Sequence, residues 1–478
     1  MSPQVARSKL TARPIARNEC APLDDIFVLP VLTQYLVYAP LSNFAALVDR
    51  LAVERIRTGL PALSNAEARP LAEIVHTLRF GAAPAPLPRR GRLQPAFLGL
   101  LPTRACNLAC EYCGFRTADD PQRVMDLSLA REAIAWYLGL VAESGEREAE
   151  VHFFGGEPFC AAEVVDFSFH FARLRAAELG CSVRFEAATN GFFDEDRCRW
   201  VADSFDSVIL SLDGPAAIQD RQRHRKDGRG SFETVARSAR ILSEGAAELS
   251  VRVCVTADTV AQMAEIAAWL CAEYRPVAVC FEPVQPTPES EAAGLTPPDP
   301  WAFAASFIQA AWVLEAHGVD TVYAAADITT RQVSFCPVGQ DVAIVSPEGA
   351  VNACYLLERD WQVKGMDLRL GAFDNGAVSL DEAVIESVRG LNVWNKPSCA
   401  SCFCKWHCAG GCHVNHAPPA APGDFDALCV QTRVIALRNV LRALGRDDLT
   451  PALLADRAAL ERAVWQRSDA LADLGARP

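Results

Sequence analysis

Short apolar runs alternate with longer stretches of helical spacing over residues 97–284. Helical spacing is clearest over residues 127–140 and 260–274. Alternation of this kind is typical of a parallel sheet built from β/α units. Six units are fewer than the eight of a closed barrel, so the pattern predicts an α/β fold with a partial (β/α)6 barrel of the TIM type. The six strands are expected at residues 97–101, 150–154, 182–187, 207–212, 249–255 and 277–281.

The regions on either side of this repeat have other patterns. Residues 26–38 are apolar and β-rich, which predicts a hairpin. Ser42 resembles a helix N-cap, and Phe44, Leu47, Val48 and Leu51 follow at helical spacing up to Gly59. A second apolar stripe is formed by Leu71, Ile74, Val75 and Leu78. These elements predict a small N-terminal α+β module.

Composition and spacing divide the chain into five segments. Residues 81–95 contain four prolines and predict a stiff linker. After the repeat, residues 301–315 have helical spacing, and cysteines then recur. Leu453, Leu454, Leu460 and Val464 indicate a terminal packing helix. The expected boundaries are 1–80 for the module, 81–95 for the linker, 96–300 for the barrel, 301–440 for a cysteine-rich domain and 441–478 for C-terminal helices.

Polar or glycine-rich motifs follow five of the six expected strands. The carboxyl ends of parallel strands meet at one edge, where barrels of this type place their chemistry. The motifs therefore predict a single functional site at the mouth of the barrel. They are the cysteine loop at 105–114, Gly-Gly-Glu-Pro at 155–158, Thr-Asn-Gly at 189–191, Ser-Leu-Asp-Gly-Pro at 211–215 and Glu-Pro at 282–283.

The loop after the first strand carries three cysteines, Cys106, Cys110 and Cys113, spaced C-x3-C-x2-C. Structural zinc sites usually use four ligands, often in two pairs. Three thiolates in one tight loop instead suit an iron–sulfur cube with one iron left open to a small molecule. The alternative is three reduced thiols that lie close together without a metal.

Charge and cysteine content limit the function classes. The net charge is −13, which disfavours nucleic acid as a main partner because phosphate contacts need clustered Lys and Arg. The N-terminus shows no apolar signal segment, and no apolar run approaches the roughly 20 residues of a membrane helix. We therefore expect a cytoplasmic protein whose 18 cysteines are reduced and include metal ligands.

The cysteine loop, with Tyr112 before its third cysteine, resembles the cluster loop of radical S-adenosylmethionine (SAM) enzymes, and Gly-Gly-Glu-Pro resembles their GGEP motif. The resemblance implies that Cys106, Cys110 and Cys113 hold a [4Fe–4S] cluster that cleaves SAM to a 5′-deoxyadenosyl radical. Arg223 is expected to pair with the SAM carboxylate, with Arg225 and Arg229 as alternatives. The other implied SAM contacts are Tyr112, Gly155, Gly156, Glu157 (to the ammonium), and Asn190 and Ser211 (to the ribose).

Seven later cysteines have the spacing of the SPASM domain, an auxiliary-cluster extension of radical SAM enzymes. The resemblance implies two auxiliary [4Fe–4S] clusters. Cys336, Cys354 and Cys412 would hold the second of them, whose fourth ligand is open or comes from another group, with Cys404, His407 and His413 as candidates. The first would be held by Cys399, Cys402, Cys408 and Cys429. The cysteines without ligand spacing are expected to be buried apolar residues; they are Cys20, Cys160, Cys181, Cys198, Cys254, Cys271 and Cys280.

Members with this extension modify peptides and proteins, which implies a maturase that crosslinks or oxidises a ribosomally made precursor peptide. The N-terminal module would bind the leader of that peptide or serve as a plain docking subdomain, and a flavodoxin or ferredoxin would supply electrons. Formylglycine formation in sulfatases is the alternative, but those relatives place an aspartate base where this chain has Tyr355. An alternative of another class is an iron–sulfur electron carrier without radical chemistry.

Overall fold

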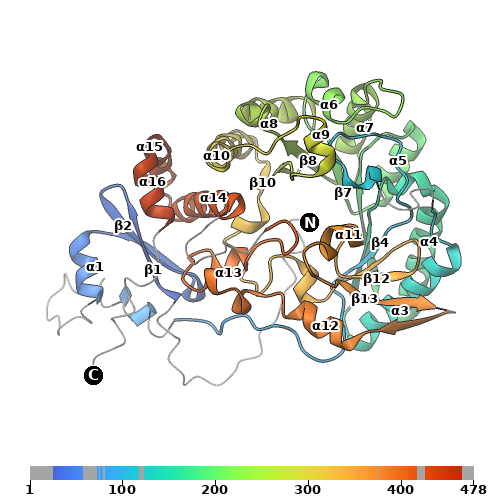
Figure 1. Cartoon of the computed structure of the whole chain (residues 1–478), viewed down its shortest axis with the longest axis horizontal. Coiled ribbons are helices and arrows are strands. Elements are labelled where there is room, and N and C mark those ends of the chain that lie inside the picture. Colours follow the sequence, from blue (N-terminus) through green and yellow to red (C-terminus); the bar gives the residue numbers. More distant parts are fainter. Residues whose placement is uncertain are drawn as a thin grey trace. The chain divides into compact units, whose positions relative to one another are not determined.

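The computed structural model describes residues 25–57, 73, 74, 76–78, 81–117, 123–374, 376–416 and 426–465. The described residues form two compact units (Figure 1). The barrel unit consists of Arg89–Tyr323 and Cys336–Leu391. The second unit takes its described residues from Gln4–Pro88, Ala324–Phe335 and Asn392–Pro478. No helix in the described part of the chain is both long and apolar enough to cross a membrane.

The barrel unit contains an open sheet of 11 strands, ordered β10-β9-β8-β7-β6-β5-β4-β11-β12-β13-β14. Every neighbouring pair from β10 to β11 is parallel, and β12, β13 and β14 continue antiparallel. The bounds are β4 (Leu98–Leu100), β5 (Glu148–Phe153), β6 (Ser182–Thr189), β7 (Ser207–Ser211), β8 (Glu248–Val255), β9 (Ala278–Pro283), β10 (Asp320–Val322), β11 (Ala343–Val345), β12 (Ala350–Asn352), β13 (Arg369–Asp374) and β14 (Ala377–Leu380).

The six expected strands are therefore confirmed as β4 to β9, in sequence order and parallel, and the partial barrel is confirmed. The repeat is larger than predicted, since β10 and β11 add one parallel strand at each side. Each of these two strands has only three residues, too few to show a pattern in the sequence. After β9 the chain forms a short helix, α9 (Pro288–Ala292), which begins with a capping box at Thr287.

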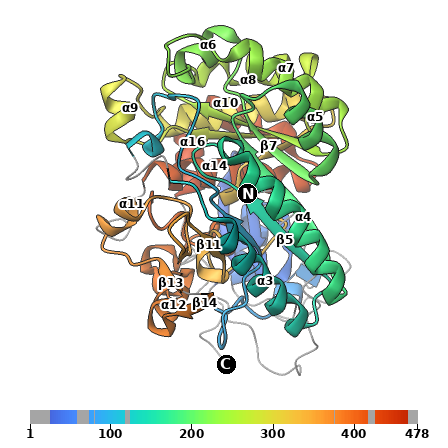
Figure 2. The ribbon, with the colours of Figure 1, turned by 90° about the vertical axis from the view of Figure 1, so that its right-hand side faces the viewer.

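The two faces of the parallel sheet differ in polarity. On the outer face Phe153 and Phe185 are buried, and Phe185 packs on Phe169 of α4. On the other face the strand register aligns Gly99, His152 and Glu186. Figure 2 shows α3 and α4 lying against β5 and its neighbours. The main helices are α3 (Leu127–Ser144), α4 (Ala162–Leu179), α5 (Glu195–Ser204), α6 (Ala216–Gln222), α7 (Phe232–Glu244), α8 (Met263–Glu273) and α10 (Pro300–Ala316).

The second unit contains a three-stranded antiparallel sheet of β1 (Phe27–Val31), β2 (Gln34–Ala39) and β3 (Phe44–Val48). The expected hairpin is confirmed as β1 and β2. Val28, Val37 and Ile56 lie in its hydrophobic core. From the second apolar stripe, Leu78 belongs to this core and Ile74 packs against it. Leu71 and Val75 of that stripe lie outside the described residues.

The helix expected after Ser42 is wrong in its first half. Phe44–Val48 is strand β3, which pairs with β2, and the helix α1 covers only Arg50–Arg57. Asn43 adopts a left-handed conformation (φ 49°) that turns the chain back along β2. The backbone amide of Ala52 donates to the Asp49 carboxylate (2.7 Å), so Asp49 performs the capping role assigned to Ser42.

Three helices end the described part of the second unit: α14 (Ala427–Ala443), α15 (Thr450–Ala455) and α16 (Arg457–Val464). The single packing helix expected over Leu453–Val464 is divided into α15 and α16. Asp456 follows α15, and its side chain caps α16 by accepting a hydrogen bond from the backbone amide of Ala459 (2.9 Å). Leu453, Leu460 and Val464 are buried, as a packing role requires. Helix α16 lies against β1.

Candidate functional site

The cysteine loop follows β4 and is held in place by backbone pairing with residues 222–225. The amide of Ala109 donates to the carbonyl of His224 (2.8 Å), and the amide of Glu111 donates to that of Gln222 (3.0 Å). A bridge between Leu108 and Arg225 extends the pairing. The loop is thus fixed by a second segment of the barrel unit rather than by its own turns alone.

The three thiols of this loop lie close together. Burial raises the pKa of both Cys106 and Cys110 to about 12, and the neighbouring thiols of the loop raise both values further. Burial thus disfavours the thiolate form of these groups, and a bound metal cation would favour it. The charges of Cys110 and Cys113 act on Cys106, and three neighbouring thiols from one loop suit a [4Fe–4S] cluster with one open iron.

The Gly-Gly-Glu-Pro motif lies directly against the backbone that leads into the cysteine loop. Gly155 has φ +147°, and a Cβ there would lie 2.4 Å from the carbonyl oxygen of Thr103. A Cβ on Gly156 would lie 2.2 Å from that of Arg104. The amide of Glu157 donates to the carbonyl of Ala105 (2.8 Å). Both glycines are therefore required for the ends of β4 and β5 to meet.

Glu157 is buried and links this motif to the end of β6. Its carboxylate accepts hydrogen bonds from the Thr189 hydroxyl (2.8 Å) and from the backbone amide of Asn190 (2.7 Å). Burial raises its pKa to about 7, although these hydrogen bonds oppose the rise. Asn190 Nδ2 in turn lies 3.5 Å from Cys106 Sγ. Glu157, Asn190 and Cys106, which follow strands β5, β6 and β4, are thus linked by successive contacts. We call these three residues the contact chain.

Asp213 joins the remaining predicted residues of the site. Its Oδ2 accepts from the Tyr112 hydroxyl (2.6 Å) and from Arg223 Nε (2.9 Å). The guanidinium of Arg223 lies 5.2 Å from the centre of the Tyr112 ring, and its NH1 is 4.0 Å from Cys110 Sγ. Sequence reasoning did not select Asp213, although it lies in the Ser-Leu-Asp-Gly motif that follows β7.

Ser211 lies on the inner face of the sheet, beside Arg252 of β8 in the register. Arg252 forms an ion pair with Glu282 of β9. His152 lies 3.2 Å from the Glu150 carboxylate and 3.6 Å from that of Glu186. The inner face below the mouth is therefore lined by ionisable side chains, unlike the apolar outer face.

Tyr355 covers the position of Gly99 on this inner face. A Cβ at residue 99 would lie 2.6 Å from the Tyr355 hydroxyl oxygen. The Tyr355 ring packs 4.7 Å from that of Phe154, centre to centre. Burial raises the pKa of Tyr355 well above its usual value, and the charges of Glu186 and Cys354 raise it further. This hydroxyl therefore remains protonated at neutral pH.

A second group of thiols lies in the second unit: Cys399, Cys402, Cys408 and Cys429. Burial raises the pKa of Cys408 to about 12, and the charges of Cys402 and Cys399 add to the rise. Burial likewise raises the pKa of Cys429, and Cys402 and Cys408 contribute. Four mutually interacting thiols are the donor set that a closed [4Fe–4S] cluster requires.

The other candidate ligands have different surroundings. Cys404 is buried beside Cys402. Burial raises the pKa of Cys404, and the hydrogen bond between the two thiols raises it further and lowers the pKa of Cys402. His407 uses both ring nitrogens in hydrogen bonds, to Tyr38 Oη (2.5 Å) and to the carbonyl of Thr330 (2.8 Å). His407 is thus a structural residue. His413 Nε2 lies 3.2 Å from the Ser334 hydroxyl.

The remaining cysteine predictions have mixed outcomes. Cys336 and Cys354 belong to the barrel unit and Cys412 to the second unit, so their grouping stays a prediction. Cys198 is buried as expected, but Cys160 is exposed, which contradicts its expected burial. It lies in the short 3-10 turn Pro158–Ala161 between β5 and α4, in which Pro158 and Ala161 are the buried residues. Cys20 lies outside the described residues.

Comparison with known proteins finds a family model and several relatives that resemble parts of this chain. A model described as the Radical SAM superfamily matches residues 100–270. The chain is 27% identical over 339 residues to a serine-type anaerobic sulfatase-maturating enzyme of Klebsiella aerogenes, covering 66% of this chain and 78% of that protein. It is 26% identical over 375 residues to the mycofactocin maturase MftC of Mycolicibacterium smegmatis, covering 72% and 87%.

Solved structures share the fold. The anaerobic sulfatase-maturing protein anSMEcpe, with bound AdoMet and the Cp18Cys peptide, superposes with a TM-score of 0.55 at 16% identity, over 73% of this chain and 99% of that one. Streptococcus suis SuiB bound to S-adenosylmethionine gives 0.51 at 14% identity, over 85% and 98%. Residues 100–270 therefore match the Radical SAM superfamily, and most of the chain shares the fold of these solved structures.

Proposed function

We propose that this enzyme is a maturase that abstracts a hydrogen atom from a ribosomally made peptide and thereby crosslinks or oxidises it. The observation that carries the proposal is the contact chain from Cys106 through Asn190 to Glu157. An electron carrier needs no carboxylate and amide beside its cluster, whereas a SAM pocket needs both. When bound, SAM and the reduced cluster supply a 5′-deoxyadenosyl radical, and the chain supplies position and a dry environment.

Each residue of the mouth has a proposed role. Cys106, Cys110 and Cys113 hold the SAM-cleaving cluster. Glu157 receives the SAM ammonium, because it is a buried carboxylate whose proton is lost near neutral pH. Arg223 is anchored through Nε by Asp213, which keeps its positive charge beside Cys110 for the SAM carboxylate. The further proposed SAM contacts are Tyr112, Gly155, Gly156, Asn190 and Ser211.

The cysteines beyond the barrel are proposed to hold two auxiliary clusters. The group of Cys399, Cys402, Cys408 and Cys429 is supported by the mutual interaction of its thiols. Cys336, Cys354 and Cys412 are assigned to the other cluster by their spacing. Clusters held by these cysteines would supply a site that takes up the electron left on the oxidised substrate or binds the substrate, and we propose an external carrier such as flavodoxin or ferredoxin as the electron donor.

The polar inner face of the sheet is the proposed substrate surface. Two ionisable pairs lie below the mouth, and each joins two neighbouring strands. Arg252 of β8 pairs with Glu282 of β9, and His152 of β5 pairs with Glu186 of β6. Charged and hydrogen-bonding groups of this kind orient a polar backbone, and a peptide offers an amide and a carbonyl at every residue. We propose that Arg252 and Glu282 bind the segment of the peptide next to the reacting carbon.

Tyr355 favours peptide modification over formylglycine formation. The Klebsiella relative is named as a sulfatase-maturating enzyme, which makes formylglycine formation the alternative function. That reaction, in the resemblance described above, uses an aspartate base where Tyr355 stands. Burial keeps the Tyr355 hydroxyl protonated, so it cannot accept a proton from substrate at neutral pH.

The N-terminal sheet supports leader recognition. SuiB has also been solved with its precursor peptide SuiA, and that structure superposes with a TM-score of 0.51 over 86% of this chain. Strand β3 lies at the edge of the sheet, and its residues are only partly buried. An extended peptide can add to such an edge through main-chain hydrogen bonds. We propose that residues 1–80 bind the leader in this way.

Anaerobic assay of the reconstituted enzyme tests both levels of the proposal. With dithionite and SAM we expect steady 5′-deoxyadenosine production, and co-expression with candidate precursor peptides should give a mass change in one of them. Clusters that are reduced while SAM stays intact would contradict radical chemistry. Deletion of residues 1–80 should abolish leader binding but preserve 5′-deoxyadenosine formation, and unchanged leader binding would show that this module has another role.

A further inference from the structure

Residues 221–229 form a basic segment of the barrel unit, in a chain whose net charge is −13. The segment contains five cationic side chains and one acidic one, Asp227. Its second half is a tight turn, in which the backbone amide of Arg225 donates to the carbonyl of Arg229 (2.9 Å) and Gly228 has a left-handed conformation (φ +79°). Lys226 lies in this turn and is exposed. We call residues 225–229 the basic turn.

The basic turn carries more positive than negative charge at the surface. Asp227 pairs with Arg225 (3.0 Å) and with Arg229 (2.6 Å), so one carboxylate serves two guanidinium groups. The Arg229 side chain is 69% exposed. Lys226 forms no ion pair with a carboxylate in the part of the chain that the structure describes. The turn is therefore a positive patch on a protein that is acidic as a whole.

The basic turn is bound directly to the cysteine loop. Leu108 forms a bridge with Arg225, and the backbone amide of Ala109 donates to the carbonyl of His224 (2.8 Å). Ala109 precedes Cys110, one of the three proposed ligands of the SAM-cleaving cluster. The exposed surface of the turn and the proposed cluster site are therefore joined by a short path of hydrogen-bonded backbone.

We propose that the basic turn is the docking surface for the electron donor, and that this donor is a small acidic one-electron carrier protein. The inference rests on the proposed function, which requires a reduced cluster in the barrel loop. The carrier loses one electron and the cluster gains it, and no bond forms or breaks. Opposite charges on the two surfaces attract and orient the carrier, whereas the net negative charge of the enzyme disfavours other approaches.

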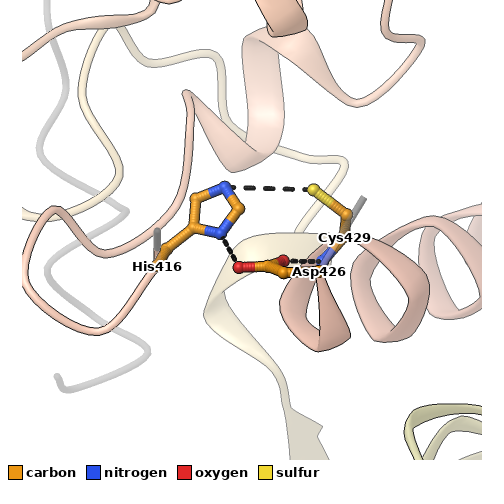
Figure 3. Close-up of side chains that lie close together, drawn as sticks. All are labelled: His416, Asp426 and Cys429. Carbon is orange, nitrogen blue, oxygen red and sulfur yellow. Dashed lines mark hydrogen bonds and ion pairs between the residues drawn. The ribbon is translucent and has the colours of Figure 1, made fainter. Parts of the chain in front are cut away.

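Two other surfaces compete for this role. Residues 89–92 contain three arginines, but they precede β4, whereas the cysteine loop follows it, so the two basic segments belong to opposite ends of that strand. The second thiol group is the other competitor. There His416 is only 4% exposed, and Asp426 lies with it beside Cys429 (Figure 3). These residues add an acidic group, which disfavours an acidic partner.

The test compares Lys226→Glu with Arg90→Glu in the full-length, reconstituted enzyme. Both substitutions change the charge by the same amount at an exposed residue, and Arg90 belongs to the basic segment at the other end of β4. Production of 5′-deoxyadenosine is measured with dithionite and, separately, with photochemically reduced flavodoxin. The affinity for flavodoxin is measured by calorimetry at low and high salt. Carbodiimide crosslinking and peptide mass spectrometry then identify which lysine contacts a carboxylate of flavodoxin.

We expect Lys226→Glu to lower both the affinity for flavodoxin and the flavodoxin-driven rate by about tenfold at low salt. The difference from wild type should disappear at high salt, where the charges are screened. The dithionite-driven rate should not change, and Arg90→Glu should match wild type in every assay. Lys226 should be the crosslinked lysine.

Four results would overturn the inference: no binding of flavodoxin to wild type, equal losses in the two variants, an unchanged affinity in Lys226→Glu, or a crosslink in the second unit. A dithionite-driven rate that falls by the same factor in Lys226→Glu would also overturn it, because the turn would then support the cysteine loop rather than a partner. Wild-type enzyme that forms no 5′-deoxyadenosine with dithionite would instead contradict the proposed function, which is a separate failure.

Discussion

The two thiol groups of this protein differ in the number of donors and in what surrounds them. The loop after β4 offers three cysteines, and its neighbours are the polar side chains of Asn190, Glu157 and Arg223. The group in the second unit offers four cysteines, which come from residues 399–408 and from the first turn of α14. Its neighbours are Cys404, the buried Arg433 and His416.

Under the proposed ligand assignment, this difference corresponds to two kinds of cluster. Three donors leave one iron without a protein ligand, and the groups nearby can bind the polar parts of a small molecule. Four donors complete the cluster, and the groups nearby can only alter its charge and potential. Under the proposed assignment, ligand number and neighbouring residues would separate a catalytic cluster from an electron-handling one within the same chain.

Removal of one thiol from the barrel loop should have the largest effect. Cys110→Ala leaves two ligands for the cluster that activates SAM, so we expect 5′-deoxyadenosine production to fall to the background level without enzyme. Iron content should fall by about four atoms per chain, the content of one [4Fe–4S] cluster. Measured turnover at the wild-type rate would show that this loop does not hold the catalytic cluster.

A matched pair of variants tests the second group. Cys429→Ala should lose one cluster and still cleave SAM in the absence of peptide, because the barrel loop is intact. Cys404→Ala changes a buried thiol beside Cys402 that we do not assign as a ligand, and it should retain all of its iron. Iron analysis and Mössbauer spectroscopy compare the two. Equal iron loss in both variants would make Cys404 a ligand.

The barrel and its mouth were largely predictable from sequence because two strong signals coincide there. Apolar runs of four to eight residues recur with helices between them, and glycine or polar motifs mark the strand ends. Gly155 and Gly156 are an example. The backbone before the cysteine loop lies so close to both residues that no side chain fits, so only glycine can occupy these positions. Local chemistry and global fold therefore point to the same residues.

Other features depended on contacts that sequence does not encode locally. Phe44, Leu47 and Val48 fit helical spacing, but pairing with β2 decides their conformation. Asp213 is one residue of an ordinary turn motif until Tyr112 and Arg223 converge on it. His416 lies beside Cys429 only because α14 brings that cysteine to it.

The pH dependence of SAM binding should depend on Glu157. Its pKa is raised to about 7, so the carboxyl is neutral below that pH and must lose a proton to pair with the SAM ammonium. We expect affinity to be greatest above pH 7 and to fall by up to about tenfold for each pH unit below it. The same raised pKa favours the ligand-free fold at low pH, and this contribution is lost as the pH rises through 7.

Glu157→Gln is the control, since an amide does not titrate in this range. Binding by this variant, measured by equilibrium dialysis of tritiated SAM, should be weaker at pH 8 and nearly independent of pH. A pH dependence that persists in Glu157→Gln would assign the titration to another group. Such a result would leave the proposed role of the thiol loop unchanged. It would show that the Glu157 carboxylate does not bind SAM beside that loop.

The smallest expected effect concerns the structural support of the second thiol group. Tyr38→Phe removes the hydrogen bond to His407, which precedes the proposed ligand Cys408, and leaves a buried imidazole nitrogen without this partner. We expect a loss of about 1–2 kcal/mol in local stability, measured as faster hydrogen exchange at the His407 amide, which bonds to Cys404. Cluster content should not change, because neither Tyr38 nor His407 is a ligand. Loss of iron in Tyr38→Phe would instead mean that His407 contributes to the metal site. The distinction between the four cysteines as ligands and His407 as a supporting residue would then be wrong.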